Sequence, residues 1–153
     1  MGIALNNRAL VTVYGGSGFL GRHTVRAIAQ TGARIRVAVR RPELAGHLQP
    51  LGGVGQIVPV QANVRFPDSL LAAAQDADAV VNLVGILFPT GKQTFKSVQD
   101  EGARNVAEAA KAAGVGTLVH VSAIGADASS ASIYARSKAA GEAAIKDVYK
   151  DAT

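Results

Sequence analysis

The stretch VYGGSGFLGRH, residues 13–23, places four glycines within seven positions. It follows an apolar run typical of a buried strand and precedes apolar residues at helical spacing. The glycines match G-x-G-x-x-G and, counted from Gly15, G-x-x-G-x-x-G. Glycine permits a tight turn, and the missing Cβ lets a pyrophosphate approach the backbone at a helix N-terminus, which attracts anions. The stretch therefore predicts a dinucleotide site; the alternative is a glycine-rich turn without a ligand.

Strand-like and helix-like segments alternate along the rest of the chain. Strand-like runs such as residues 79–84 are apolar continuously rather than alternately, as expected for a parallel sheet covered by helices on both faces. The segment between the second and third strands is looser and rich in Gly and Pro. We expect an α/β fold: a doubly wound parallel sheet (Rossmann fold) within one NAD(P)-binding domain, residues 1–153. The predicted strands are 9–14, 35–39, 56–61, 79–84 and 117–122, and the predicted helices are 19–31, 68–76, 95–113 and 134–149.

Composition narrows the class of protein. The chain has 153 residues, of which 48% are hydrophobic, and this suits one α/β domain. The absence of cysteine excludes disulfides and thiolate metal sites. His23, His47 and His120 are scattered, so we predict no metal site. No run approaches the roughly 18 apolar residues of a membrane span, and the N-terminus lacks a signal-peptide pattern, so we expect a cytoplasmic protein.

The basic residues are concentrated near the glycine turn. The formal net charge is +5, and seven arginines precede Glu43, the first acidic residue. This excess could indicate a nucleic-acid partner. However, aromatic residues are few and no RNA- or DNA-binding motif is present, so we expect no nucleic acid.

The end of the second predicted strand indicates which dinucleotide binds. A Rossmann domain that prefers NAD usually carries an Asp or Glu about 20 residues after the glycines, where it accepts from the ribose 2′-hydroxyl. Here Arg40 and Arg41 occupy that position. Guanidinium groups suit a 2′-phosphate, so NADP is predicted over NAD. Alternatively these arginines are solvated loop cations, and Arg22 could equally assist a phosphate.

A tyrosine and a lysine lie four residues apart in the last predicted helix. Tyr134 and Lys138 therefore share one helix face. A free tyrosine has a pKa near 10, and a nearby ammonium lowers it by favouring the phenolate. Following a fifth strand of this architecture, the pair is a candidate acid/base centre.

Together these motifs resemble the short-chain dehydrogenase/reductase superfamily over almost the whole chain. The resemblance is closest to the atypical, extended branch that includes the nucleotide-binding accessory subunit of respiratory complex I and its bacterial relatives. It is carried by the glycine turn, by Arg36 to Pro42, by Val81-Asn82-Leu83-Val84-Gly85, by His120-Val121-Ser122-Ala123, and by Tyr134 to Glu142.

The resemblance implies a role for each matched position. Tyr134 would be the acid/base, Lys138 would bind the nicotinamide ribose, and Ser122 would orient a substrate carbonyl. The cofactor-binding residues it implies are Gly15, Gly18, Phe19, Leu20, Gly21, Arg40, Arg41, Asn63, Val64, Gly85, Tyr134 and Lys138. Among them, the three glycines would bind the pyrophosphate, Asn63 and Val64 would lie beside the adenine, and Gly85 would lie near the riboses.

The chain departs from the family pattern at several positions. Asn63 stands where the family often has Asp, and Val84 replaces a small alanine. The catalytic serine of extended members tends to lie at the positions of Ala123 and Ile124, so Ser129, Ser130 and Ser132 are further candidates. Extended members also continue into a sixth strand and a substrate lobe, so we expect a chain truncated before both, with an exposed fifth strand whose backbone groups are unpaired.

These observations leave two main functions. The first is a nucleotide-binding accessory, structural or sensor role in a larger assembly such as respiratory complex I. Partner subunits would then bind through the fifth strand, and the protein would be peripheral to the inner membrane through that complex. The second is the cofactor half of an NADP-dependent oxidoreductase, epimerase or dehydratase acting on a sugar or other carbonyl compound.

Overall fold

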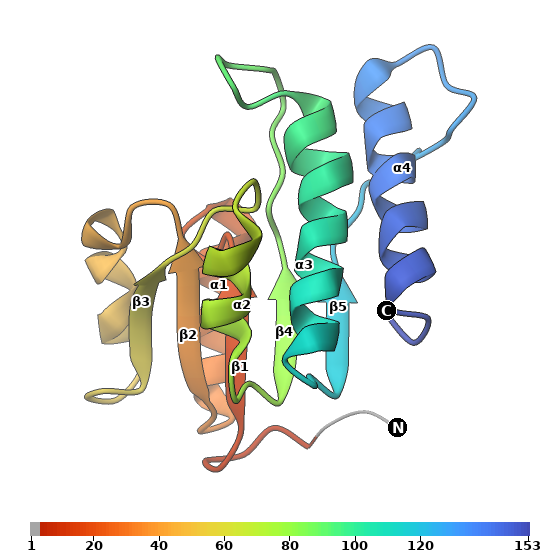
Figure 1. Cartoon of the computed structure of the whole chain (residues 1–153). Coiled ribbons are helices and arrows are strands. Elements are labelled where there is room, and N and C mark those ends of the chain that lie inside the picture. Colours follow the sequence, from red (N-terminus) through yellow and green to blue (C-terminus); the bar gives the residue numbers. More distant parts are fainter. Residues whose placement is uncertain (1–3) are drawn as a thin grey trace.

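A computed structural model describes residues 4–153, and its five strands form one parallel sheet (Figure 1). The strand order is β3-β2-β1-β4-β5, with every neighbouring pair parallel. This order confirms the predicted doubly wound Rossmann sheet. The strands are β1 (Leu10–Tyr14), β2 (Arg34–Val39), β3 (Ile57–Gln61), β4 (Ala79–Asn82) and β5 (Thr117–His120).

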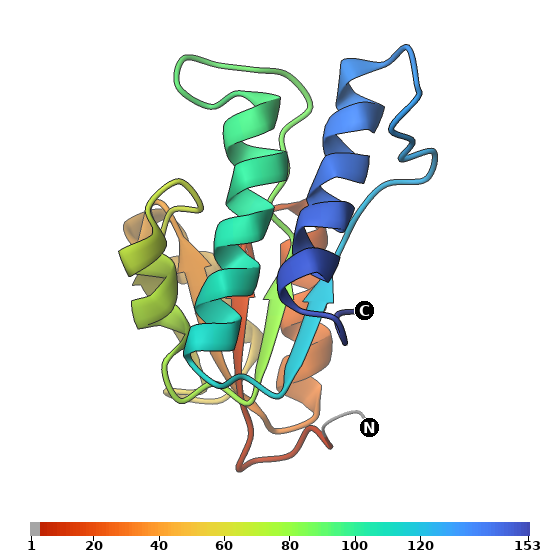
Figure 2. The ribbon, with the colours of Figure 1, turned by 45° about the vertical axis from the view of Figure 1, so that its right-hand side comes forward.

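Helices cover both faces of the sheet, as predicted. Three helices, α2, α3 and α4, lie side by side over one face, and α1 lies against the other (Figures 1 and 2). The looser segment between β2 and β3 forms two short 3₁₀ helices, η1 (Pro42–Leu44) and η2 (Gly46–Leu51). The α-helices are α1 (Phe19–Gln30), α2 (Pro67–Ala74), α3 (Glu101–Ala112) and α4 (Ile133–Val148).

Several predicted elements differ from the structure in their extent. β4 and β5 each end two residues earlier than predicted, at Asn82 and His120. After Asn82 the chain leaves the sheet, because the Val84 N–H donates to the Asn82 side-chain oxygen instead of to a neighbouring strand. The helix predicted at 95–113 begins with a π-helical turn, η3 (Lys96–Asp100), and continues as α3.

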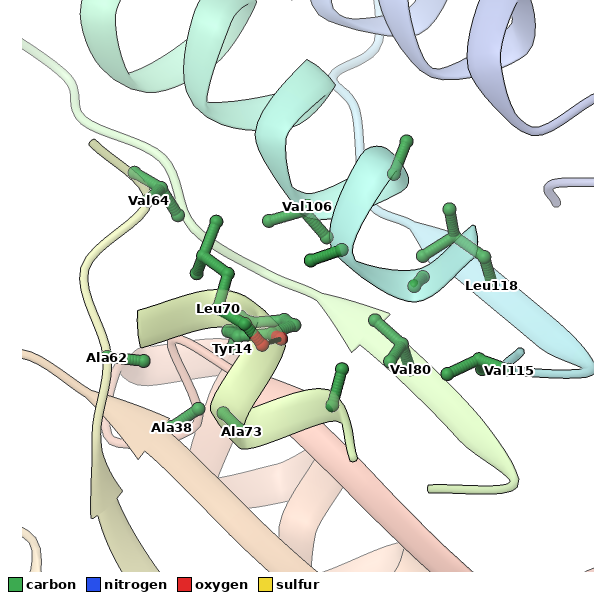
Figure 3. Close-up of a cluster of buried hydrophobic side chains, with 14 of the residues drawn as sticks. Tyr14, Ala38, Ala62, Val64, Leu70, Ala73, Val80, Val106, Val115 and Leu118 are labelled. Atoms are coloured by element: carbon green, nitrogen blue, oxygen red, sulfur yellow. Dashed lines mark hydrogen bonds between the residues drawn. The ribbon is translucent and has the colours of Figure 1, made fainter. Parts of the chain in front are cut away.

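The hydrophobic core is divided by the sheet into two clusters. The larger one lies beneath α2 and α3, and Figure 3 displays its side chains, including Leu70, Val106 and Leu118. Its buried polar atoms are satisfied: the Tyr14 hydroxyl donates to the Leu70 carbonyl (2.6 Å) and the Thr12 hydroxyl to that of Ala73 (2.7 Å). These bonds fix the end of β1, where the glycine turn begins, against α2.

The outer edge of β5 is partly paired. The His120 N–H donates to the Thr153 carbonyl (2.8 Å), and the Thr153 N–H donates to the Leu118 carbonyl (3.0 Å). The expectation of an unpaired edge is therefore wrong at these two residues of β5. Among the described residues 4–153, no helix is both long and apolar enough to cross a bilayer.

Candidate functional site

The glycine turn joins β1 to α1 at the carboxyl end of the sheet. The helix begins at Phe19, as predicted, with Gly18 as its N-cap and no side chain capping it. The first N–H groups of a helix have no partner within the helix, and the helix dipole makes this end positive. The turn thus presents backbone donors to an anion, as the dinucleotide interpretation requires.

The glycines of the turn meet different spatial demands. Gly15 has φ +76°, a left-handed conformation that other residues rarely adopt. A Cβ on Gly21 would lie 2.6 Å from the Gly15 carbonyl oxygen and would overlap the Gly16 backbone, so this glycine permits close packing of α1 on the turn. A Cβ on Gly18 would meet only the Gly15 carbonyl oxygen, at 3.4 Å. Gly18 therefore leaves open the space that a pyrophosphate needs.

A cleft of about 240 Å³ opens beside the turn, along the carboxyl ends of β1 to β4. Six of the predicted cofactor residues line it: Gly15, Gly18, Arg40, Asn63, Val64 and Gly85. Predicted residues outside its lining are Phe19, Leu20, Gly21, Arg41, Tyr134 and Lys138. The cleft thus gathers residues predicted for the pyrophosphate, the 2′-phosphate and the adenine.

The arginines that follow the glycine turn have separate positions. Arg40 lines the cleft and is exposed, whereas Arg41 is exposed outside it. Arg36 lies away from the phosphate region, where its guanidinium donates to the carbonyls of Ala73 (2.8 Å) and Gln75 (2.6 Å) at the end of α2. Arg36 is thus a helix-capping cation.

Two buried polar side chains hold the segment that follows β4. The Asn82 amide contacts a ring nitrogen of His120 (3.1 Å) while its oxygen accepts from the Val84 N–H (3.1 Å). The side-chain oxygen of Gln99, in η3, accepts from the Ile86 N–H (2.9 Å). These bonds fix the backbone on both sides of Gly85, at the border of the cleft.

Lys138 is buried beside this segment. Its ammonium donates to the Val121 carbonyl (3.0 Å) and would lie 3.9 Å from a Cβ on Gly85. Burial lowers the pKa of Lys138, while the carboxylate of Glu142 opposes that shift. Tyr134 lies one turn earlier on α4, its ring edge-on to Phe95 at 5.9 Å. The structure thus brings Lys138 next to Gly85, with Tyr134 on the same helix.

A hydrogen-bonded chain links the Gly85 segment to the helix that carries this pair. The Gln99 amide donates to the Ser137 hydroxyl (2.7 Å), which donates to the Tyr134 carbonyl (2.7 Å). Gly141 lets α4 approach η3, because a Cβ there would collide with the Gln99 carbonyl oxygen. Gln99, Ser137 and Gly141 were not among the site residues predicted from the sequence. Gly141 could have been noticed, because a glycine inside a predicted helix costs about 1 kcal/mol and therefore indicates a packing requirement.

Ser122, the predicted substrate-orienting residue, lines a different hollow. This hollow, of about 210 Å³, is also lined by His120, Glu142 and Lys146, and it does not share lining residues with the cleft. The Ser122 hydroxyl and one ring nitrogen of His120 are buried there without a hydrogen-bond partner among the described residues 4–153. Burial, with the nearby Lys138 ammonium, lowers the pKa of His120 to about 4.

The alternative serines have structural partners. Ser129 donates to the Asp127 carboxylate (2.8 Å), and the Ser130 carbonyl accepts from the Arg136 guanidinium. Ser132 caps α4 by accepting from the Ala135 N–H (3.3 Å). None of the three lines the cleft.

Comparison with protein families assigns the chain a class. Residues 15–153 match the model of a family described as NAD(P)H-binding, and the chain belongs to that family. The family assignment agrees with the glycine turn and the cleft. The fold is also that of solved dehydrogenases: a mutant of uronate dehydrogenase from Agrobacterium tumefaciens complexed with NAD superposes with a TM-score of 0.73 at 22% identity, covering 94% of this chain and 58% of that one.

Curated relatives identify the branch. The chain is 32% identical over 142 residues to the 40 kDa subunit of mitochondrial NADH-ubiquinone oxidoreductase from Neurospora crassa, covering 93% of this chain. It is 38% identical over 144 residues to a ceramide reductase from Caulobacter vibrioides, covering 94%. The predicted resemblance to the complex I accessory branch is thereby confirmed. The chain spans 38% and 44%, respectively, of the lengths of these relatives.

Proposed function

We propose that residues 1–153 form one domain that binds NADP(H) in preference to NAD(H). The observation that carries the preference is Arg40, which lines the cleft at the end of β2. This is where an NAD-preferring Rossmann domain carries a carboxylate, and a guanidinium binds a 2′-phosphate by charge-assisted hydrogen bonds. Arg41, exposed next to it, would reach the same phosphate from outside the cleft.

The other cleft residues suit the remaining parts of the cofactor. The turn from Gly15 to Gly18 would hold the pyrophosphate, and Asn63 and Val64 would lie beside the adenine. Gly85 would border the riboses and Lys138 the nicotinamide ribose, because the lysine ammonium lies next to Gly85. When bound, the nicotinamide would supply hydride chemistry.

For the whole protein we propose an accessory, structural or sensor role, with the nucleotide held inside a larger assembly. Two observations favour this role over turnover. The relatives include a subunit of NADH-ubiquinone oxidoreductase. Ala123 and Ile124 stand where extended members of the superfamily tend to carry the catalytic serine, so that hydroxyl is missing there. Partner subunits and a position at the inner membrane through such a complex follow from this proposal.

The enzymatic alternative is an NADP-dependent oxidoreductase, epimerase or dehydratase acting on a sugar or other carbonyl compound. It is favoured by Lys138, which is buried next to Gly85 one turn after Tyr134. In this alternative Tyr134 would move a proton at its hydroxyl, and Lys138 would bind the nicotinamide ribose. NADPH oxidation that requires an added carbonyl compound and is abolished in Tyr134→Phe would support it, whereas tight NADPH binding without oxidation supports the accessory role.

The cofactor proposal is tested by replacing both arginines with alanine. Arg40→Ala/Arg41→Ala should weaken NADPH binding by about 1.5–3 kcal/mol, the value of hydrogen bonds to charged groups, and should leave NADH binding nearly unchanged. Calorimetric titration of both cofactors measures the difference. Arg34→Ala, at the opposite end of β2, is the matched control for the loss of a cation. Equal losses for NADPH and NADH would contradict the proposal.

A further inference from the structure

The loop between β4 and η3 is anchored where it reaches the cleft. Thr90 and Gln93 exchange two backbone hydrogen bonds, each 3.0 Å long, across a tight turn. The Ser97 hydroxyl donates to the Lys92 carbonyl (3.1 Å), and Ser97 and Thr94 bond each other through backbone and side chain. Residues on both sides of Gln93 are therefore held in place, and Gln93 is presented by a preorganised turn.

Gln93 lines the dinucleotide cleft, although no sequence motif includes it. Its side-chain amide makes no hydrogen bond with any other residue in the described part of the chain, 4–153. A carboxamide has two donors and one acceptor oxygen. A partly buried amide on an anchored turn, with its hydrogen-bonding capacity unused, is available to a ligand in the cleft.

The positions of the other lining residues indicate which part of the ligand lies nearest. The phosphates belong at Gly15 and Gly18, and the ribose 2′-position belongs at Arg40. The base attached to that ribose must occupy the rest of the cleft, where buried Val64 and Val98 supply apolar surfaces for its faces. Gln93 is the polar residue that the β4–η3 loop adds to the lining of the cleft.

We propose that Gln93 binds the hydrogen-bonding edge of the adenine and thereby contributes to selection of the base. Adenine presents an amino donor next to a ring-nitrogen acceptor, and the amide of glutamine complements both groups. This inference rests on the proposed binding of NADP(H) and extends it to the adenine. The etheno derivative of NADPH, in which a two-carbon bridge joins the amino nitrogen to the adjacent ring nitrogen, lacks this edge.

The test compares NADPH with its etheno derivative on the whole chain by calorimetry. The variant is Gln93→Leu, which keeps a similar bulk but removes both hydrogen-bonding groups, and the control is Lys92→Ala on the same turn. We expect the wild-type chain and the control to bind NADPH about tenfold tighter than the etheno derivative. Gln93→Leu should weaken NADPH about tenfold, leave the etheno derivative unchanged, and so abolish the difference.

The possible failures are distinguishable. If the folded wild-type chain binds neither nucleotide, the proposed NADP(H) function fails and the inference fails with it. If the wild-type chain binds NADPH and Gln93→Leu binds it within twofold of wild type, only the role of Gln93 is refuted. An equal loss for both nucleotides in Gln93→Leu would also refute that role, because it would indicate a general disturbance of the cleft.

Discussion

A single added methyl group should affect different properties at two glycines of the same turn: NADPH binding at Gly18 and stability of the fold at Gly21. At Gly18, whose φ is −74°, an alanine Cβ would lie 3.4 Å from its nearest neighbour, which is ordinary contact. The fold should therefore lose no more than about 1 kcal/mol, the cost of alanine at an N-cap. The methyl group would nevertheless occupy the space that the pyrophosphate needs. We expect Gly18→Ala to weaken NADPH at least about tenfold, or 1.4 kcal/mol.

At Gly21 the same change should damage the fold. An alanine Cβ would lie 2.6 Å from the Gly15 carbonyl oxygen and closer still to the Gly16 backbone, and backbone atoms cannot swing away. Overpacking of this kind costs about 1–3 kcal/mol. Urea unfolding of both variants gives the free energy of unfolding, and calorimetry gives NADPH affinity. The reasoning is refuted if Gly18→Ala binds NADPH within twofold of wild type, or if Gly21→Ala is as stable as wild type.

Two further predictions concern α4 and β5. The pKa of His120 is lowered to about 4 from 6.5, so the unfolded chain takes up the proton first and stability falls as the pH drops from about 6.5 toward 4. Between pH 7.5 and pH 4.5, we expect the free energy of unfolding of wild type, measured with urea, to fall by about 2 kcal/mol more than that of His120→Gln. His23→Gln, at an exposed histidine, is the control and should behave like wild type. Equal pH dependence of His120→Gln and wild type would contradict this prediction. Gly141→Ala should lower the free energy of unfolding by about 1–3 kcal/mol, because its Cβ would collide with the Gln99 carbonyl oxygen. This loss is expected even though alanine favours a helix over glycine by about 1 kcal/mol. A raised melting temperature would contradict the close packing of α4 on η3.

The parts of the structure set by local sequence were predictable. The glycine turn, the start of α1 at Phe19 and the apolar strands depend on residues adjacent in the chain. The ends of β4 and β5 were less predictable. β4 ends at Asn82, whose side-chain oxygen accepts from the Val84 N–H. Because Leu83 and Val84 are apolar, the sequence predicts a strand that continues to residue 84.

The parts set by tertiary contacts could not be predicted. Arg36 and Arg40 are four residues apart, yet only Arg40 lines the cleft, because Arg36 lies within β2 and binds the carbonyls at the end of α2. The π-helical turn that carries Gln99 packs against Gly141, 42 residues later in the chain, and no local pattern encodes that contact. The anchoring of Gln93 likewise depends on the hydroxyl of Ser97 reaching back to the turn.

The most direct test of the account is calorimetric titration of the wild-type chain with NADPH and with NADH at near-physiological salt. Circular dichroism on the same sample should first establish that the chain is folded. We predict that NADPH binds at least about tenfold tighter than NADH, a gap of about 1.4 kcal/mol, because Arg40, which lines the cleft at the end of β2, would bind the 2′-phosphate. Equal binding of both cofactors, or tighter binding of NADH, would contradict the 2′-phosphate site.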